Sequence, residues 1–163
     1  MNNSRIRGYI RQLQQGYYGG NWLDEDFEKK LKLVNEENAF IKPDGHIHSI
    51  AEVTSHILEW RKELIERLSS GRGAVLQMES ANNWYSNDFL KLNGWAMLKA
   101  GLDASQQELI LLLENKDDTF LENKCSDDMS YEWLLAGLIE HDIYHLGQIG
   151  LIYKQVTYQT SST

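Results

Sequence analysis

Residues Ser130–Tyr158 have the sequence SYEWLLAGLIEHDIYHLGQIGLIYKQVTY. Apolar side chains recur in it at steps of three and four residues, the spacing of one face of an α-helix. Ser130 is a residue type that caps helix N-termini. The stretch therefore predicts a long helix from Ser130 to about Tyr158. Its inward face would carry Trp133, Leu134, Gly137, Leu138, His141, Tyr144, His145, Gln148, Ile149 and Ile152.

Two earlier segments have the same periodicity. Residues 6–17 carry apolar side chains at steps of three and four, and Gly19-Gly20 follows them as a helix stop. The next helix is predicted to begin at Ser49, because Ser49 and Glu52 have the types and spacing of a capping box. We expect it to end at Gly71.

A third such segment runs from about Asn93 to Asn115, and Gly101 and Asp103 predict a kink in its middle. Pro43 is the only proline in the chain, which favours long helices over a turn-rich β fold. Together the four segments predict an all-α fold, a four-helix bundle.

Two long connections separate these helices. The first includes a short predicted helix around Asp24 to Asn35, and the second, Ser70 to Leu92, is rich in Asn, Ser and Gly. Long connections on a four-helix pattern favour crossovers over simple hairpins, and loops of this length often cover functional sites. We expect one domain over residues 1–158 and a polar C-terminal tail over residues 159–163.

Composition narrows the classes of partner. The chain has 163 residues, enough for one sizeable core, and its net charge is −8 without a dense Lys/Arg cluster. A nucleic acid or an anionic membrane surface is therefore not an expected partner. No apolar run approaches the roughly 20 residues of a membrane span, and Cys125 is the only cysteine, so no intramolecular disulfide can form. The cytoplasm is the expected location.

Three histidines form the candidate site. His141 and His145 are four residues apart, so their side chains lie one turn apart on the inward face of the last helix. His56 lies on the inward face of the second helix. A divalent metal would satisfy all three buried rings, and neutral imidazoles suit zinc, nickel, cobalt, iron or copper better than magnesium or calcium. Three protein ligands would leave a position open for water, as in catalytic sites.

The chain resembles the DinB/YfiT-like superfamily, and the resemblance covers roughly Ile6 to Tyr153. It rests on the segments SIAEVTSHILEW at residues 49–60 and EHDIYHLGQI at residues 140–149. Trp22, Trp95 and the segment 113–117 add weaker support.

That resemblance implies a four-helix bundle with crossover connections. It implies one divalent metal per chain, usually nickel or zinc, held by His56, His141 and His145, and a homodimer. Members of the family act on small molecules as thiol-cofactor-dependent transferases and isomerases or as metal-dependent hydrolases. In the mycothiol-dependent branch the middle ligand tends to be Glu; the histidine at position 141 weakens assignment to that branch.

Several neighbours of the histidines have two interpretations each. Gln148 could orient a ligand or substrate, or form a helix–helix hydrogen bond. Tyr144 could place its hydroxyl near the metal, or serve as a core or interface aromatic. Glu140 or Asp142 could accept an imidazole N–H, or remain solvated.

Other conspicuous residues have simpler expected roles. His46 and His48 precede the second helix; they could lie at the mouth of a cavity or be merely solvated, and they are not expected to be ligands. Cys125 is expected to be a packed residue. Three tryptophans are expected in the core and two glycines at close helix contacts: Trp60, Trp95, Trp133, Gly137 and Gly147.

Three functional hypotheses follow. The first is a metal-dependent enzyme, a hydrolase or a low-molecular-weight-thiol S-transferase, with an open coordination position. The second is a non-catalytic bundle whose metal serves stability, sensing or dimer assembly, with the fourth position closed by a carboxylate or His48. The third has no metal, and the histidines are core or pH-sensitive groups.

Overall fold

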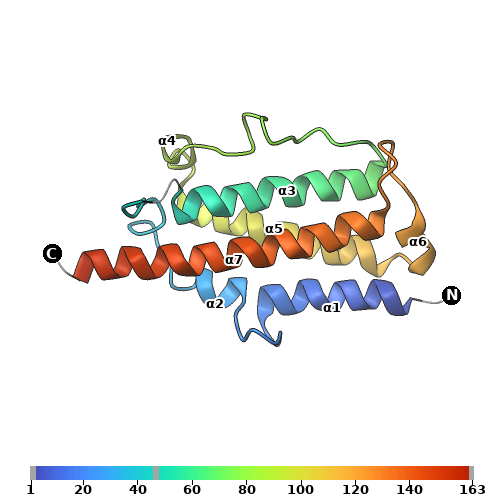
Figure 1. The fold of residues 1–163 in the computed structure, drawn as a ribbon, viewed down its shortest axis with the longest axis horizontal. Helices are drawn as coiled ribbons and strands as arrows, with labels where there is room; N and C mark the ends of the chain where they lie inside the picture. Colours follow the sequence, from blue (N-terminus) through green and yellow to red (C-terminus); the bar gives the residue numbers. More distant parts are fainter. Residues whose placement is uncertain (1–2, 46–47, 162–163) are drawn as a thin grey trace.

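A computed structural model describes residues 3–45 and 48–161 of the chain (Figure 1). Four long helices form a bundle, and three short helices lie at its ends and on its side. The long helices are α1 (Ser4–Tyr18), α3 (Ile50–Ser70), α5 (Gly94–Glu114) and α7 (Tyr131–Ser161). The short ones are α2 (Phe27–Leu31), α4 (Asn87–Leu90) and α6 (Asp118–Glu122).

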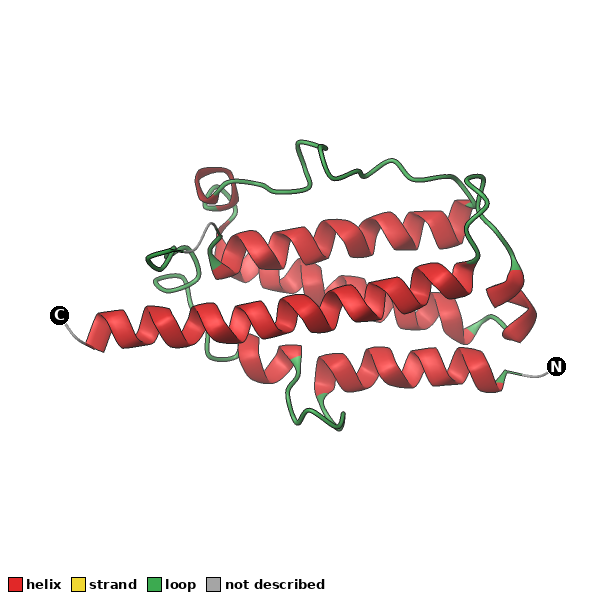
Figure 2. Ribbon diagram, in the orientation of Figure 1, coloured by secondary structure: helices red, strands yellow, loops and turns green. Residues whose placement is uncertain are grey.

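The described residues contain no strand, only an isolated bridge between Lys124 and Ser130, and Figure 2 shows helices joined by loops. The all-α bundle predicted from the sequence is therefore confirmed. Within the same residues, no helix combines the length and the apolar character that crossing a bilayer requires.

The two long connections differ in their path. The one after α3 runs back along the length of the bundle, so that α3 and α5 point in the same direction (Figure 1). The one after α1 contains α2 and turns at the end of the bundle where α3 begins. The returning connection lies along α3, close to the face on which the histidines were predicted.

The start of α3 is fixed as the sequence predicts. The Ser49 side chain accepts the backbone N–H of Glu52 at 3.2 Å, and the Glu52 carboxylate accepts the N–H of Ser49 at 3.1 Å. The helix ends at Gly71, whose φ of +72° belongs to the left-handed region that glycine adopts without strain. These two caps fix where α3 begins and ends.

The core consists of two clusters of buried apolar residues, one at each end of the bundle. One includes Phe27, Ile50, Ile57, Leu102 and Ile149, and the other includes Ile6, Leu64, Leu109, Leu113 and Leu135. Arg61 lies in the interior as well, with only 1 % of its surface exposed. Its guanidinium lies over the rings of Tyr17 and Phe27, at 5.3 and 5.6 Å from their centroids.

Several details differ from the sequence predictions. α5 is one continuous helix, because Gly101 allows Leu58 of α3 to approach and Asp103 accepts hydrogen bonds from Tyr17 and Lys99. α2 is shorter than the predicted helix because Asp26 caps it. α7 continues to Ser161, past its predicted end at about Tyr158.

The tryptophan and glycine predictions were partly wrong. Trp95 is buried, but Trp60 is only half-buried and Trp133 is 60 % exposed. A Cβ placed at Gly137 or Gly147 would meet no atom within 4 Å, so neither glycine lies at a close helix contact. The close helix contact lies at Gly101 instead, where an added Cβ would be 3.0 Å from the Leu58 side chain.

Candidate metal centre

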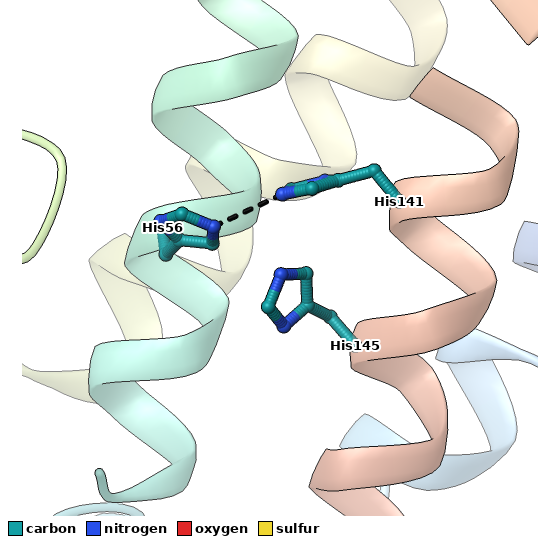
Figure 3. A group of neighbouring side chains, drawn as sticks. All are labelled: His56, His141 and His145. Carbon is teal, nitrogen blue, oxygen red and sulfur yellow. Dashed lines mark hydrogen bonds between the residues drawn. The ribbon is translucent and has the colours of Figure 1, made fainter. Parts of the chain in front are cut away.

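The three predicted histidines meet in the interior of the bundle. His56 extends from α3, and His141 and His145 extend from successive turns of α7 toward it (Figure 3). Each can offer a ring nitrogen such that all three nitrogens lie within 4.8 Å of one another. The Nε2 atoms of His56 and His141 are 3.0 Å apart. The convergence that the sequence predicts is therefore present in the fold.

The connection between α3 and α5 fixes the orientation of His56. Nδ1 of His56 lies 2.9 Å from the backbone carbonyl oxygen of Asn83, which makes Nδ1 the protonated nitrogen and leaves Nε2 with its lone pair. The ring of Trp84 stacks on the His56 ring, with 3.9 Å between centroids and 6° between planes. Both contacts direct Nε2 toward α7.

Asn83 is itself held in place. Its side chain accepts the indole N–H of Trp60 at 3.0 Å and donates to the carbonyl of Met78 at 2.8 Å. Asn83 is only 1 % exposed. Sequence analysis missed Asn83 and Trp84, because both lie in an irregular connection where no periodicity marks an inward side chain.

His145 is oriented from its own helix. Its Nδ1 lies 2.7 Å from Oε1 of Gln148, so Nδ1–H donates and Nε2 remains available. Gln148 therefore orients a candidate metal ligand, His145, through a hydrogen bond within α7. Tyr144 is 65 % exposed, and its ring contacts that of His145 edge-on at 4.9 Å between centroids.

His56 and His145 are buried, His141 is half-buried, and all three are electrically neutral at neutral pH. Burial, with repulsion from His145 and His56, lowers the pKa of His141 to about 3. Burial lowers the pKa of His145 to about 4, although the hydrogen bond that His145 donates to Gln148 acts in the opposite direction. Burial also lowers the pKa of His56 below 6.5. Neutral imidazole is the form that binds metal ions.

This donor set fits a divalent metal ion. Three neutral imidazoles whose ring nitrogens approach one point are typical ligands of zinc, nickel, cobalt, iron or copper. His56 and His141 share a hydrogen bond through their Nε2 atoms, but Nδ1 of His141 is buried without a partner, so the three rings do not satisfy one another fully. Among the described residues, the group of possible ligands contains no carboxylate or thiolate.

The other loop histidines stand apart from this group. His48 stacks on the opposite face of Trp84 from a distance of 3.8 Å, and its Nδ1 lies 3.5 Å from the Glu52 carboxylate. His48 therefore does not close the fourth position. His46 lies outside the described residues.

The carboxylates beside His141 do not accept an imidazole N–H. Asp142 is buried and accepts two hydrogen bonds from Arg61, at 2.7 and 3.4 Å, while Gln106 accepts a third from Arg61 at 2.8 Å. Glu140 is exposed on α7. The suggestion that Asp142 serves an imidazole or stays solvated was wrong, because it is the partner of a charge inside the core. Arg61 lies four residues after Ile57, on the apolar face of α3. That position could have indicated a buried charge in need of a carboxylate partner.

A cavity of about 370 Å³ reaches the histidines from one side. It lies between α3, α7 and the returning connection, and His141 and Trp60 are among its lining residues. Cys125 is not one of them; it is buried and its sulfur contacts Arg67 and Asp127, in agreement with the predicted packed role. Of the three histidines, only His141 lines this cavity, so a small molecule in it would contact the group at His141.

Comparisons with known proteins give one match. A family model with the description DinB superfamily matches residues 22–149, which is well over half of the chain. No curated protein and no solved structure matches the chain.

Proposed function

The chain belongs to the DinB superfamily, and from this premise we propose that it is a divalent-metal-dependent enzyme acting on a small molecule, by hydrolysis or by transfer to a low-molecular-weight thiol. Nickel and zinc are the metals we favour. The observation that carries the proposal is the convergence of His56, His141 and His145 without a fourth protein ligand among the described residues. An open position beside a cavity is what a catalytic site needs and a purely structural site lacks.

Each residue of the site has a defined task in this proposal. The Nε2 atoms of His56 and His145 would hold the metal. The Nδ1 atom of each ring is occupied, because it donates a hydrogen bond to the Asn83 carbonyl oxygen or to Gln148 Oε1. His141 would supply the third nitrogen. A metal ion bound there lowers the pKa of water or holds a thiol as thiolate, which are the requirements of the two reactions.

The test begins with protein purified without a metal-chelating column. We expect elemental analysis to find close to one divalent metal ion per chain, and His141→Ala to lose most of it. Activity against thioester, amide and thiol-transfer substrates should fall with the metal, while circular dichroism keeps the helix signal. Metal-free wild-type protein, or full activity in His141→Ala, would refute the proposal.

A non-catalytic metal-binding bundle is the second candidate. It is favoured by the position of the histidines between α3 and α7, since a metal there would tie two core helices together. This candidate predicts that chelation lowers the melting temperature and that no substrate of the panel is turned over. Turnover that is lost on chelation and restored by added metal would exclude it.

A further inference from the structure

The cavity beside His141 has an apolar wall made by three parts of the chain. α3 contributes Leu64 and Trp60, the returning connection contributes Leu76, and α7 contributes Leu138 and Trp133. Its volume of about 370 Å³ falls in the range of sites that enclose small organic molecules. Gly137 widens it on the α7 side, because a Cβ there would meet no atom within 4 Å.

The charged residues of this wall already have partners within the protein. The Glu63 carboxylate accepts two hydrogen bonds from Arg72 at 3.0 Å each, and further ones from the backbone N–H groups of Val75 and Leu76 at 3.0 and 3.2 Å. These contacts neutralise Glu63 and also fasten the returning connection to α3.

The second charged pair of the wall is Arg67 and Asp127. They form a salt bridge, and Arg67 also donates to the sulfur of Cys125 at 3.1 Å, while Nε of Arg67 is buried without a hydrogen-bond partner. Thus each acidic residue in the wall is matched by an arginine. Apart from a metal ion at the centre itself, a charged ligand would give up its hydration in this cavity and meet only side-chain charges that are already paired, which costs binding free energy.

We propose that this cavity binds an uncharged, mainly apolar molecule with an aromatic ring, and that this is the class of substrate presented to the metal centre. The claim that this molecule is a substrate of the metal centre rests on the proposed function. The indoles of Trp60 and Trp133 supply flat apolar surfaces, and aromatic ligands gain from such surfaces beyond the area they bury. The paired charges of the wall disfavour multiply charged anions such as phosphate esters or polycarboxylate thiols.

Two probes with the same ring system test the charge rule. 2-Naphthol is uncharged at neutral pH and 2-naphthalenesulfonate is an anion. In isothermal titration calorimetry of the wild-type protein, we expect saturable binding of 2-naphthol. Its affinity should be at least about tenfold higher than that of the sulfonate, because the sulfonate loses its hydration in the cavity without gaining an unpaired charged partner. Equal or tighter binding of the sulfonate, or no binding of 2-naphthol, would overturn the inference.

Two glycine variants of α7 test the location. Gly137→Leu places a side chain in the cavity and should reduce 2-naphthol affinity by about tenfold or more, the effect of filling an apolar site. Gly147→Leu is the matched control, because Gly147 also has open space around it but lines a different cavity. It should leave 2-naphthol binding unchanged. Equal effects of the two variants would refute the location.

Metal analysis of the same samples separates this inference from the proposed function. Gly137→Leu should keep the metal content of the wild type while it loses the probe. A metal-free wild-type protein that still binds 2-naphthol would refute the enzyme proposal and support the binding site. Trp133→Ala, which changes a side chain that is 60 % exposed, gives a second variant with little risk to folding and should also weaken 2-naphthol binding.

Discussion

At the scale of single residues, the centre depends on which nitrogen of each imidazole carries the proton. Asn83 and Gln148 settle this for His56 and His145, because each accepts from Nδ1 and leaves Nε2 free. His141 has no such acceptor, and its Nδ1 is buried without a partner. We therefore expect His141 to be the most adaptable of the three rings.

Gln148 provides the residue-scale prediction. Gln148→Leu removes the acceptor of His145 while retaining a side chain of similar size. We expect metal affinity, measured by competition with a chromogenic chelator, to fall by about 10- to 100-fold, the usual effect of removing such a partner. Gln155→Leu on the same helix is the control and should bind metal like the wild type. An unchanged affinity in Gln148→Leu would show that the hydrogen bond does not orient the ligand.

The limits of sequence reasoning are also clearest at this scale. His56, His141 and His145 could be predicted because helical spacing alone decides which face a side chain occupies. Asn83 and Trp84 could not, since their contacts with His56 depend on the path of an irregular connection across α3. The solvated or imidazole-bound role suggested for Asp142 was wrong because its partner, Arg61, lies 81 positions away in the sequence.

At the scale of elements, the long helices were predictable, and of the short ones only α2 was predicted. The periodicity of α1, α3, α5 and α7 spans several turns, whereas α4 has four residues and α6 has five, too few for a periodic signal. α5 runs through Gly101 without a break, and the residue permits the contact between α5 and α3. Tertiary packing thus outweighs a weak local preference.

Gly101 supplies the prediction for this scale. Gly101→Val should lower the free energy of unfolding by about 1–3 kcal/mol, because added methyl groups must displace the buried Leu58. Gly8→Ala on α1 is the comparison, since no atom lies within 4 Å of its Cβ position. It should raise stability by up to about 1 kcal/mol through helix propensity. Urea denaturation measures both, and a stabilised Gly101→Val would contradict the tight contact.

At the scale of the whole molecule, one buried ion pair connects the helices that carry the histidines. Arg61 of α3 and Asp142 of α7 are 1 % and 5 % exposed, and Gln106 joins α5 to the same network. Asp142→Asn leaves the arginine without a countercharge and should cost about 3–5 kcal/mol of stability. Glu140→Gln, on the exposed side of α7, should change stability by less than about 0.5 kcal/mol. Chemical denaturation of both variants checks this, and equal stabilities would contradict it.

The attachment of the returning connection to α3 depends on pH. Hydrogen bonds from Arg72, Val75 and Leu76 outweigh the effect of burial and hold the pKa of Glu63 below 4.5. Such a group stabilises the fold above its unfolded-state pKa, and the contribution is lost as the pH falls through the lower folded-state value. Glu63→Gln should thus be less stable than the wild type at pH 7, and the difference should shrink toward pH 3.

Thermal unfolding across that pH range measures the Glu63 effect. Glu66→Gln is its control, because that carboxylate is mostly exposed and lies 4.0 Å from Arg72. Its stability should follow the wild type at every pH. If the loss of stability in Glu63→Gln is as large at low pH as at pH 7, the attachment of the returning connection to α3 does not depend on the charge of Glu63.

The stacking of Trp84 on His56 gives the protein a built-in optical reporter. If His56 holds a metal ion as proposed, the indole whose centroid is 3.9 Å from that of His56 would lie where an ion with a partly filled d shell, such as nickel or cobalt, quenches fluorescence, whereas d¹⁰ zinc would not. The emission lost on replacing Trp84 by phenylalanine would then differ between the two kinds of ion. The identity of the bound ion could be followed in dilute solution, and in real time, from light that the polypeptide itself emits.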